Sequence, residues 1–126
     1  MERNQLEFYL NRGNSFGFEL TSEDNNYISW VSLDKNKVDQ RKLEVFTEEE
    51  MSALYEEQRL NEKQPYVLRI AELKKEVYDS DRYTQNDDYK RNDIYRFSSL
   101  EEVSYFLSSY NLDLKDIRWY SEIKAD

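Results

Sequence analysis

The chain of 126 residues contains no histidine and no cysteine. Enzymes use histidine most often as a general base and cysteine as a thiolate nucleophile, so neither mechanism is open to this chain. The same two residues supply most ligands of protein-bound zinc, and disulfide bonds require cysteine. These absences favour a binding protein over an enzyme. We therefore expect no catalytic residue, no bound metal and no cofactor.

Glycine occurs twice and proline once. The phosphate-binding patterns G-x-x-x-x-G-K-[ST] and G-x-G-x-x-G do not occur, which argues against a nucleotide site of either kind. No Pro/Gly/Ser-rich linker divides the chain, so we expect a single domain over residues 1–126. No apolar run approaches the ~20 residues that span a bilayer. The stretch MERNQLEFYL also lacks the features of a secretory signal, and a cytoplasmic protein is expected.

Acidic residues outnumber basic residues in the chain, with 27 Asp and Glu against 18 Lys and Arg. The formal net charge is -9. Such a surface repels phosphates, so we expect neither nucleic acid nor an anionic membrane as a direct partner. A basic protein is the expected partner, attracted by the summed field of the chain. Eleven tyrosines add side chains that are enriched at interfaces, although many rings must lie in the core. Solubility alone would also explain the charge.

Alternating apolar residues predict β-structure in the first third of the chain. Two such runs, Gln5–Leu10 and Phe16–Leu20, flank a turn-forming segment at residues 11–14. The β-branched and aromatic run Tyr27–Leu33 predicts a third strand, and Lys42–Phe46 a fourth. Because polar turns separate these runs, we expect an antiparallel meander.

Helix signals begin after this region. Thr47 and Glu50 have the spacing of a capping box, and consecutive glutamates suit the positive end of a helix dipole. They predict a helix over residues 48–60. The segment 66–78 is ambiguous, because its first half alternates like a strand and its second half is rich in helix formers. We expect a strand at its start.

A second capping box, from Ser99 to Glu102, predicts a helix over residues 100–110 with Asn111 as its C-cap. Short strands are expected on either side of this helix, at Ile94–Phe97 and Ile117–Ile123. The sequence thus predicts an α+β fold, with an N-terminal antiparallel β-meander plus two main helices packed on a mixed or antiparallel sheet.

The stretch between residues 79 and 93 is almost wholly polar and is predicted to be a long loop, either functional or mobile. It fails as a calcium loop, because the sixth position from Asp79 is Thr84 and the twelfth is Lys90. Its tyrosines could supply contact area and its carboxylates could pair with Arg and Lys. The expected partner-binding residues of this loop are Asp79, Asp81, Tyr83, Asp87, Asp88, Tyr89 and Asp93.

The predicted helix 48–60 offers a second acidic patch, with Glu49 and Glu56 as expected contact residues. An ordinary solvated helix face would explain the same residues.

These features predict a small acidic, non-catalytic inhibitor that binds the basic nucleic-acid-binding surface of a nuclease or another nucleic-acid enzyme, in the manner of anti-CRISPR proteins and other phage-encoded antagonists. An immunity protein or antitoxin that neutralises a toxin nuclease is the first alternative. A small enzyme or ligand-binding domain that uses tyrosines and carboxylates is the second. The sequence leaves the oligomeric state and the partner's identity open.

Overall fold

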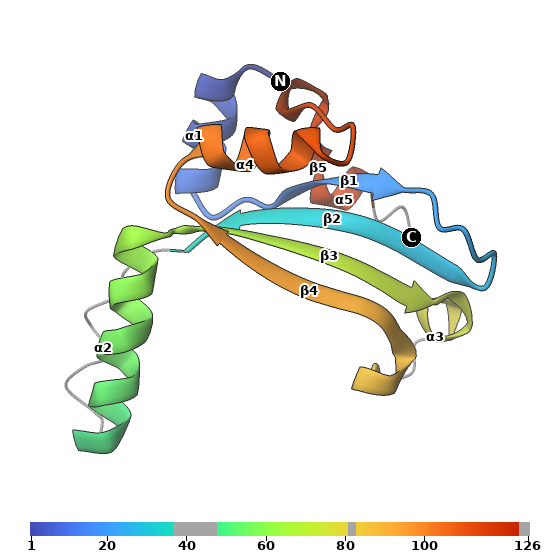
Figure 1. The fold of residues 1–126 in the computed structure, drawn as a ribbon, viewed down its shortest axis with the longest axis horizontal. Coiled ribbons are helices and arrows are strands. Elements are labelled where there is room, and N and C mark those ends of the chain that lie inside the picture. The colour runs from blue at the N-terminus through green and yellow to red at the C-terminus, as the bar shows by residue number, and fades with distance from the viewer. Residues whose placement is uncertain (37–47, 81–82, 124–126) are drawn as a thin grey trace.

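The computed structural model describes residues 1–36, 48–80 and 83–123 of the chain. Its centre is an antiparallel sheet of five strands in the order β4-β3-β2-β1-β5 (Figure 1). β1 to β4 lie next to one another in chain order, which confirms the predicted α+β class and the antiparallel meander. The strands are β1 (Phe16–Leu20), β2 (Tyr27–Lys35), β3 (Tyr66–Lys74), β4 (Tyr89–Phe97) and β5 (Arg118–Trp119).

Two helices cover one face of this sheet, α1 (Arg3–Asn11) and α4 (Leu100–Ser108) (Figure 1). Alternate residues of the strands point toward these helices, as the period of a strand requires. The helices contribute side chains at helical spacing to the same core. The fully buried members of this core include Leu6, Leu10, Phe16, Val31, Leu33, Leu68, Ile70, Val103 and Leu107.

The strand predicted at Gln5–Leu10 is wrong, because these residues lie in α1. Leu6 and Leu10 are buried, as the prediction required, but Phe8 between them is 52% exposed. Residues four apart share a helix face, whereas every second residue shares a strand face. Leu6 and Leu10 fit the period of a helix as well as that of a strand. Only the exposure of Phe8 distinguishes the helix from the strand.

The other predictions for the first half of the chain are largely confirmed. β1 has the predicted bounds, β2 extends two residues beyond the predicted end, and β3 is a strand at the start of the ambiguous segment. That segment then ends in the short helix α3 (Lys75–Asp79). The predicted helix is α2 (Glu48–Lys63). The strand predicted at Lys42–Phe46 and the proposed cap Thr47 lie outside the described residues.

α4 has the predicted N-terminal cap, but it ends at Ser108, two residues before the predicted end, and its C-cap is Ser109 instead of Asn111. The Ser99 hydroxyl accepts a hydrogen bond from the Glu102 amide at 3.2 Å, and the Glu102 carboxylate accepts one from the Ser98 amide at 2.9 Å. Asn111 lies in the turn that follows the helix, with a φ of 59° in the left-handed region and its amide bonded to the Ser108 carbonyl oxygen at 3.1 Å. Local side-chain hydrogen bonds therefore fix the N-terminal end of this helix.

The long loop predicted over residues 79–93 is wrong in its second half. β4 begins at Tyr89, so Tyr89 and Asp93 are strand residues, and the strand predicted at Ile94–Phe97 is only its last part. The strand predicted at Ile117–Ile123 is also too long, because β5 has two residues and α5 (Tyr120–Ile123) follows it directly.

The second face of the sheet is covered over β1 and β2 and at the end of β3 that leads into α3. Trp30, Leu73 and Val77 pack there with Ile123 in a smaller apolar cluster. No helix of the described residues lies over the second face along the middle of β3 and β4 (Figure 1). We call this region the open face. None of the helices in the described ranges combines the length and the apolar composition that crossing a bilayer requires.

Candidate partner-binding surface

The structure separates the two groups of predicted contact residues. α2 leaves the sheet at one end, whereas α3 and the segment leading into β4 lie at the opposite end (Figure 1). Glu49 and Glu56 are exposed on α2. Asp79, Tyr83 and Asp87 are exposed at the other end, and the Tyr83 side chain is 95% exposed. The two groups do not form one continuous patch, and Asp81 lies outside the described residues.

Asp88 lies inside the molecule instead of on the expected loop surface. It is 5% exposed, and its carboxylate accepts a hydrogen bond from the Gln85 amide at 2.9 Å. This bond caps a short 3₁₀ turn over Asn86–Asp88. The spacing of Gln85 and Asp88, which is that of a capping box, is the sequence signal that would have indicated this role.

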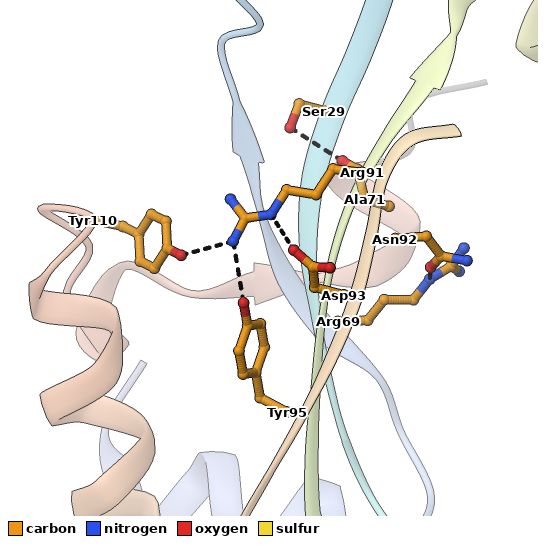
Figure 2. A network of polar contacts seen from close by, with 8 residues as sticks. All are labelled: Ser29, Arg69, Ala71, Arg91, Asn92, Asp93, Tyr95 and Tyr110. Atoms are coloured by element: carbon orange, nitrogen blue, oxygen red, sulfur yellow. Dashed lines mark hydrogen bonds and ion pairs between the residues drawn. The ribbon is translucent and has the colours of Figure 1, made fainter. Parts of the chain in front are cut away.

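Asp93 is bound by Arg91 on the same strand, and Figure 2 shows the network around them. The Arg91 guanidinium donates from Nε to the Asp93 carboxylate at 2.5 Å. Its Nη2 donates to the hydroxyls of Tyr110 at 2.8 Å and Tyr95 at 3.2 Å. The bond to Asp93 is the main reason that the pKa of Arg91 is raised. The network links β4 to the end of α4, and the charge of Asp93 is balanced within the chain.

Tyr89 belongs to the open face, where it contacts a second arginine. The Arg69 guanidinium lies 5.1 Å from the centroid of the Tyr89 ring and 6.0 Å from that of Trp30. Such distances allow cation–π attraction. Arg69 Nε also donates to the Asn92 side-chain oxygen at 2.6 Å (Figure 2). Arg69 is therefore held in place by neutral groups.

Arg96 lies on the same face as Arg69, since Val67 and Arg96 are directly opposed across β3 and β4 and Val67 is two residues from Arg69. Its Nη1 donates to the Asn61 side-chain oxygen at 3.0 Å. Within the described part of the chain, no carboxylate oxygen lies within 4.0 Å of a nitrogen of either arginine. Sequence reasoning missed this cationic surface because β4 was predicted to be mostly loop.

α2 is the most acidic element, with six glutamates against one arginine and one lysine. Its described side chains from Glu48 to Leu60 are exposed, except that of Gln58, which is half-buried. Tyr55 and Leu60 are 47% and 45% exposed. Glu49 and Glu56 are two turns apart on one side of the helix, about 10 Å along its axis. α2 projects from the sheet and exposes both charged and apolar side chains (Figure 1).

A shallow hollow on the outer side of α4 was also missed. Phe97, Tyr105 and Phe106 line it, and Glu101 and Glu102 lie at its rim. Tyr105 is 84% exposed, and the Phe97 and Phe106 rings are 5.2 Å apart. Exposed aromatic side chains are enriched at protein interfaces.

Hydrogen bonds and burial shift the pKa values of two further side chains, Glu102 and Tyr66. The pKa of Glu102 is lowered by the hydrogen bond from the Ser98 amide, which is the effect of a helix cap. Burial and a hydrogen bond to Glu7 at 2.6 Å raise the pKa of Tyr66, which therefore stays protonated. The described residues contain no group of three or more acidic side chains placed to hold a metal ion.

Comparison of the chain with known protein families, with curated proteins and with solved structures gave no match. The arguments for function therefore come from the surface itself: an acidic projecting helix, a cationic open face and an aromatic hollow.

Proposed function

We propose that this chain is a cytoplasmic, non-catalytic inhibitor that binds the basic nucleic-acid-binding surface of a nuclease or another nucleic-acid enzyme. The contact is made by α2 and centres on Glu49 and Glu56. The channel of such an enzyme is positively charged because it must hold phosphates. An acidic helix that enters the channel excludes the substrate.

The segregation of charge in the fold supports this proposal. The acidic residues of α2 lie on a projecting element, and the arginines of the open face lie on β3 and β4. A helix that projects can enter a channel that a flat sheet surface cannot. The summed charge of -9 adds long-range attraction to a cationic partner.

The exposed apolar side chains of α2 supply the second argument. Tyr55 and Leu60 are each nearly half exposed, on a helix that otherwise shows charged groups to solvent. Binding energy is concentrated in a few buried side chains at an interface, and tyrosine is among the most frequent of them. Carboxylates would then orient the helix in the channel, and Tyr55 would anchor it.

A charge-reversal experiment tests the proposal. DNA cleavage is measured with a guide-RNA-loaded CRISPR nuclease, a restriction endonuclease and a toxin DNase, each with increasing amounts of the chain. We expect at least one of them to be inhibited. The double variant Glu49→Lys with Glu56→Lys should lose the inhibition, by about 100-fold in the inhibitory concentration, because two attractive contacts become repulsive.

The matched control is Glu23→Lys with Glu76→Lys, which changes the net charge equally at exposed positions near the opposite end of the sheet. This control should keep nearly full inhibition. The proposal is overturned if no enzyme of the panel is bound or inhibited. It is also overturned if the control variant loses inhibition as strongly as the α2 variant, since the total charge would then matter and α2 would not.

A further inference from the structure

β4 is an edge strand of nine residues, as long as β2 and β3. Its inner side pairs with β3 from Tyr66–Phe97 to Leu73–Tyr89. Its outer side has no neighbouring strand among the described residues. The backbone N–H and C=O groups on such an edge are available to another extended segment. In several recognition domains, peptides bind by adding a strand at an edge of this kind.

The charge of β4 is opposite to that of the molecule. The strand carries Lys90, Arg91 and Arg96 against one acid, Asp93, in a chain with a net charge of -9. Arg91 is already bound to Asp93 on the face toward α4. On the open face, Arg96 and its neighbour Arg69 have no described carboxylate within 4.0 Å.

The strand register places Val67, Arg69, Ala71 and Leu73 of β3 and Tyr89, Asn92, Ile94 and Arg96 of β4 on the second face. Ala71 and Leu73 are buried in the smaller apolar cluster, so the other six side chains form the open face. None of them is acidic, and Ile94 is 63% exposed. Arg69 and Arg96 each use one nitrogen to donate to an asparagine oxygen. An arginine has five N–H donors, so both guanidinium groups are held in position with donors to spare.

From this edge and its charge, we infer that β4 binds an acidic, extended segment of a partner protein as an additional strand. Backbone hydrogen bonds align the segment with β4. Its alternate side chains face the open face, where carboxylates reach Arg96 and Arg69 and an apolar side chain covers Ile94. Arg96 contacts Asn61 near the end of α2, but the surface does not include Glu49 or Glu56, and the inference does not rest on the proposed inhibition.

Two other occupants fit the surface less well. A second copy of this chain would place β4 beside β4, so that Lys90, Arg91 and Arg96 would meet an equally cationic strand. Nucleic acid would not use the backbone groups of the edge, and the net charge of -9 repels phosphates. The charge of the edge therefore favours an acidic protein segment.

A display library of random twelve-residue segments tests the inference by selection on the whole chain. We expect the recovered segments to be enriched in Asp and Glu at alternate positions, with β-branched residues between them. Net charge alone would select basic segments from the same library. Binding of a recovered segment, measured by fluorescence anisotropy, should weaken about tenfold with Arg96→Glu and with Ile94→Glu.

Lys115→Glu is the matched control, because it makes the same charge change as Arg96→Glu at a side chain that is 74% exposed and distant in the sequence from β4. It should leave binding unchanged. Ile94→Glu alters an exposed side chain, so it keeps the test valid if Arg96→Glu disturbs the contact with Asn61. Failure to recover acidic segments overturns the inference, as does undiminished binding by both variants. A dimer formed through β4 in sedimentation analysis would also overturn it.

Discussion

At the scale of single residues, Gly17 decides how closely the C-terminal segment packs on the sheet. It lies in the middle of β1, on the second face. A Cβ atom at this position would lie 2.5 Å from Ile123 Cδ1 and would also collide with the Val31 carbonyl oxygen. The missing side chain therefore makes room for α5 against the strand.

We expect Gly17→Ala to lower the free energy of unfolding by about 1–3 kcal/mol, because the added methyl group overpacks a filled site. Urea unfolding followed by circular dichroism measures the change. Glu19→Ala on the same strand and face is the control, and as an exposed substitution it should stay within about 0.5 kcal/mol. Equal midpoints for the two variants would contradict this account of Gly17.

At the scale of elements, α4 depends on its N-terminal cap, in which the Glu102 carboxylate accepts from the Ser98 amide. This bond lowers the pKa of Glu102 in the folded chain. A group with a lowered pKa stabilises the fold above its unfolded pKa of about 4.3, and the contribution is lost as the pH falls through the folded pKa.

We therefore expect Glu102→Gln to be less stable than the native chain at pH 7, with a difference that closes as the pH falls below the unfolded pKa of about 4.3 and through the lower folded pKa. Urea midpoints at a series of pH values give this difference. Glu101→Gln, on the same helix turn but without a described backbone bond to its carboxylate, should show a smaller dependence. A constant difference for Glu102→Gln over the whole range would exclude the cap as its cause.

The elements also show where sequence patterns succeed. β1, β2 and α4 were predictable because one face of each is apolar and their caps and turns are local. α1 was not, because the apolar positions 6 and 10 satisfy the periods of a helix and of a strand alike. The first part of β4, before Ile94, was missed because both of its faces carry polar residues. One face binds through Arg91 and its tyrosine partners, and the other is open.

The same reasoning explains the candidate surfaces. Glu49 and Glu56 were predictable as exposed acidic residues, since the periodicity of α2 is visible in its sequence. The prediction that Asp79, Asp88, Tyr89 and Asp93 share one loop was wrong. Tyr89 and Asp93 belong to β4, which pairs with the distant strand β3. The cationic open face depends on the register between β3 and β4, which no local pattern specifies.

At the scale of the whole molecule, charge is distributed unevenly. The net charge of -9 coexists with cationic residues on β4 and an acidic α2. Like charges repel one another within a folded chain, and salt screens this repulsion over a Debye length of about 10 Å at 0.1 M. The fold itself should therefore respond to ionic strength.

We expect the melting temperature to rise by about 2–5 °C between 10 and 200 mM NaCl at pH 7. Scanning calorimetry measures this shift. The variant Glu49→Lys with Glu56→Lys brings the formal charge from -9 to -5 and should show a smaller rise. A melting temperature that falls with added salt would mean that attractive pairs outweigh the repulsion.

β5 is a very short strand, yet it closes one side of the sheet. Two residue pairs, Phe16–Trp119 and Gly17–Arg118, occupy the outer edge of β1. Proteolytic removal of the segment from Arg118 onward would leave β1 bare while β4 is already free. A sheet with two unprotected sides can add copies of itself without limit, as fibrils do. β5 thus covers the edge of β1 that would otherwise be open to a strand of another chain.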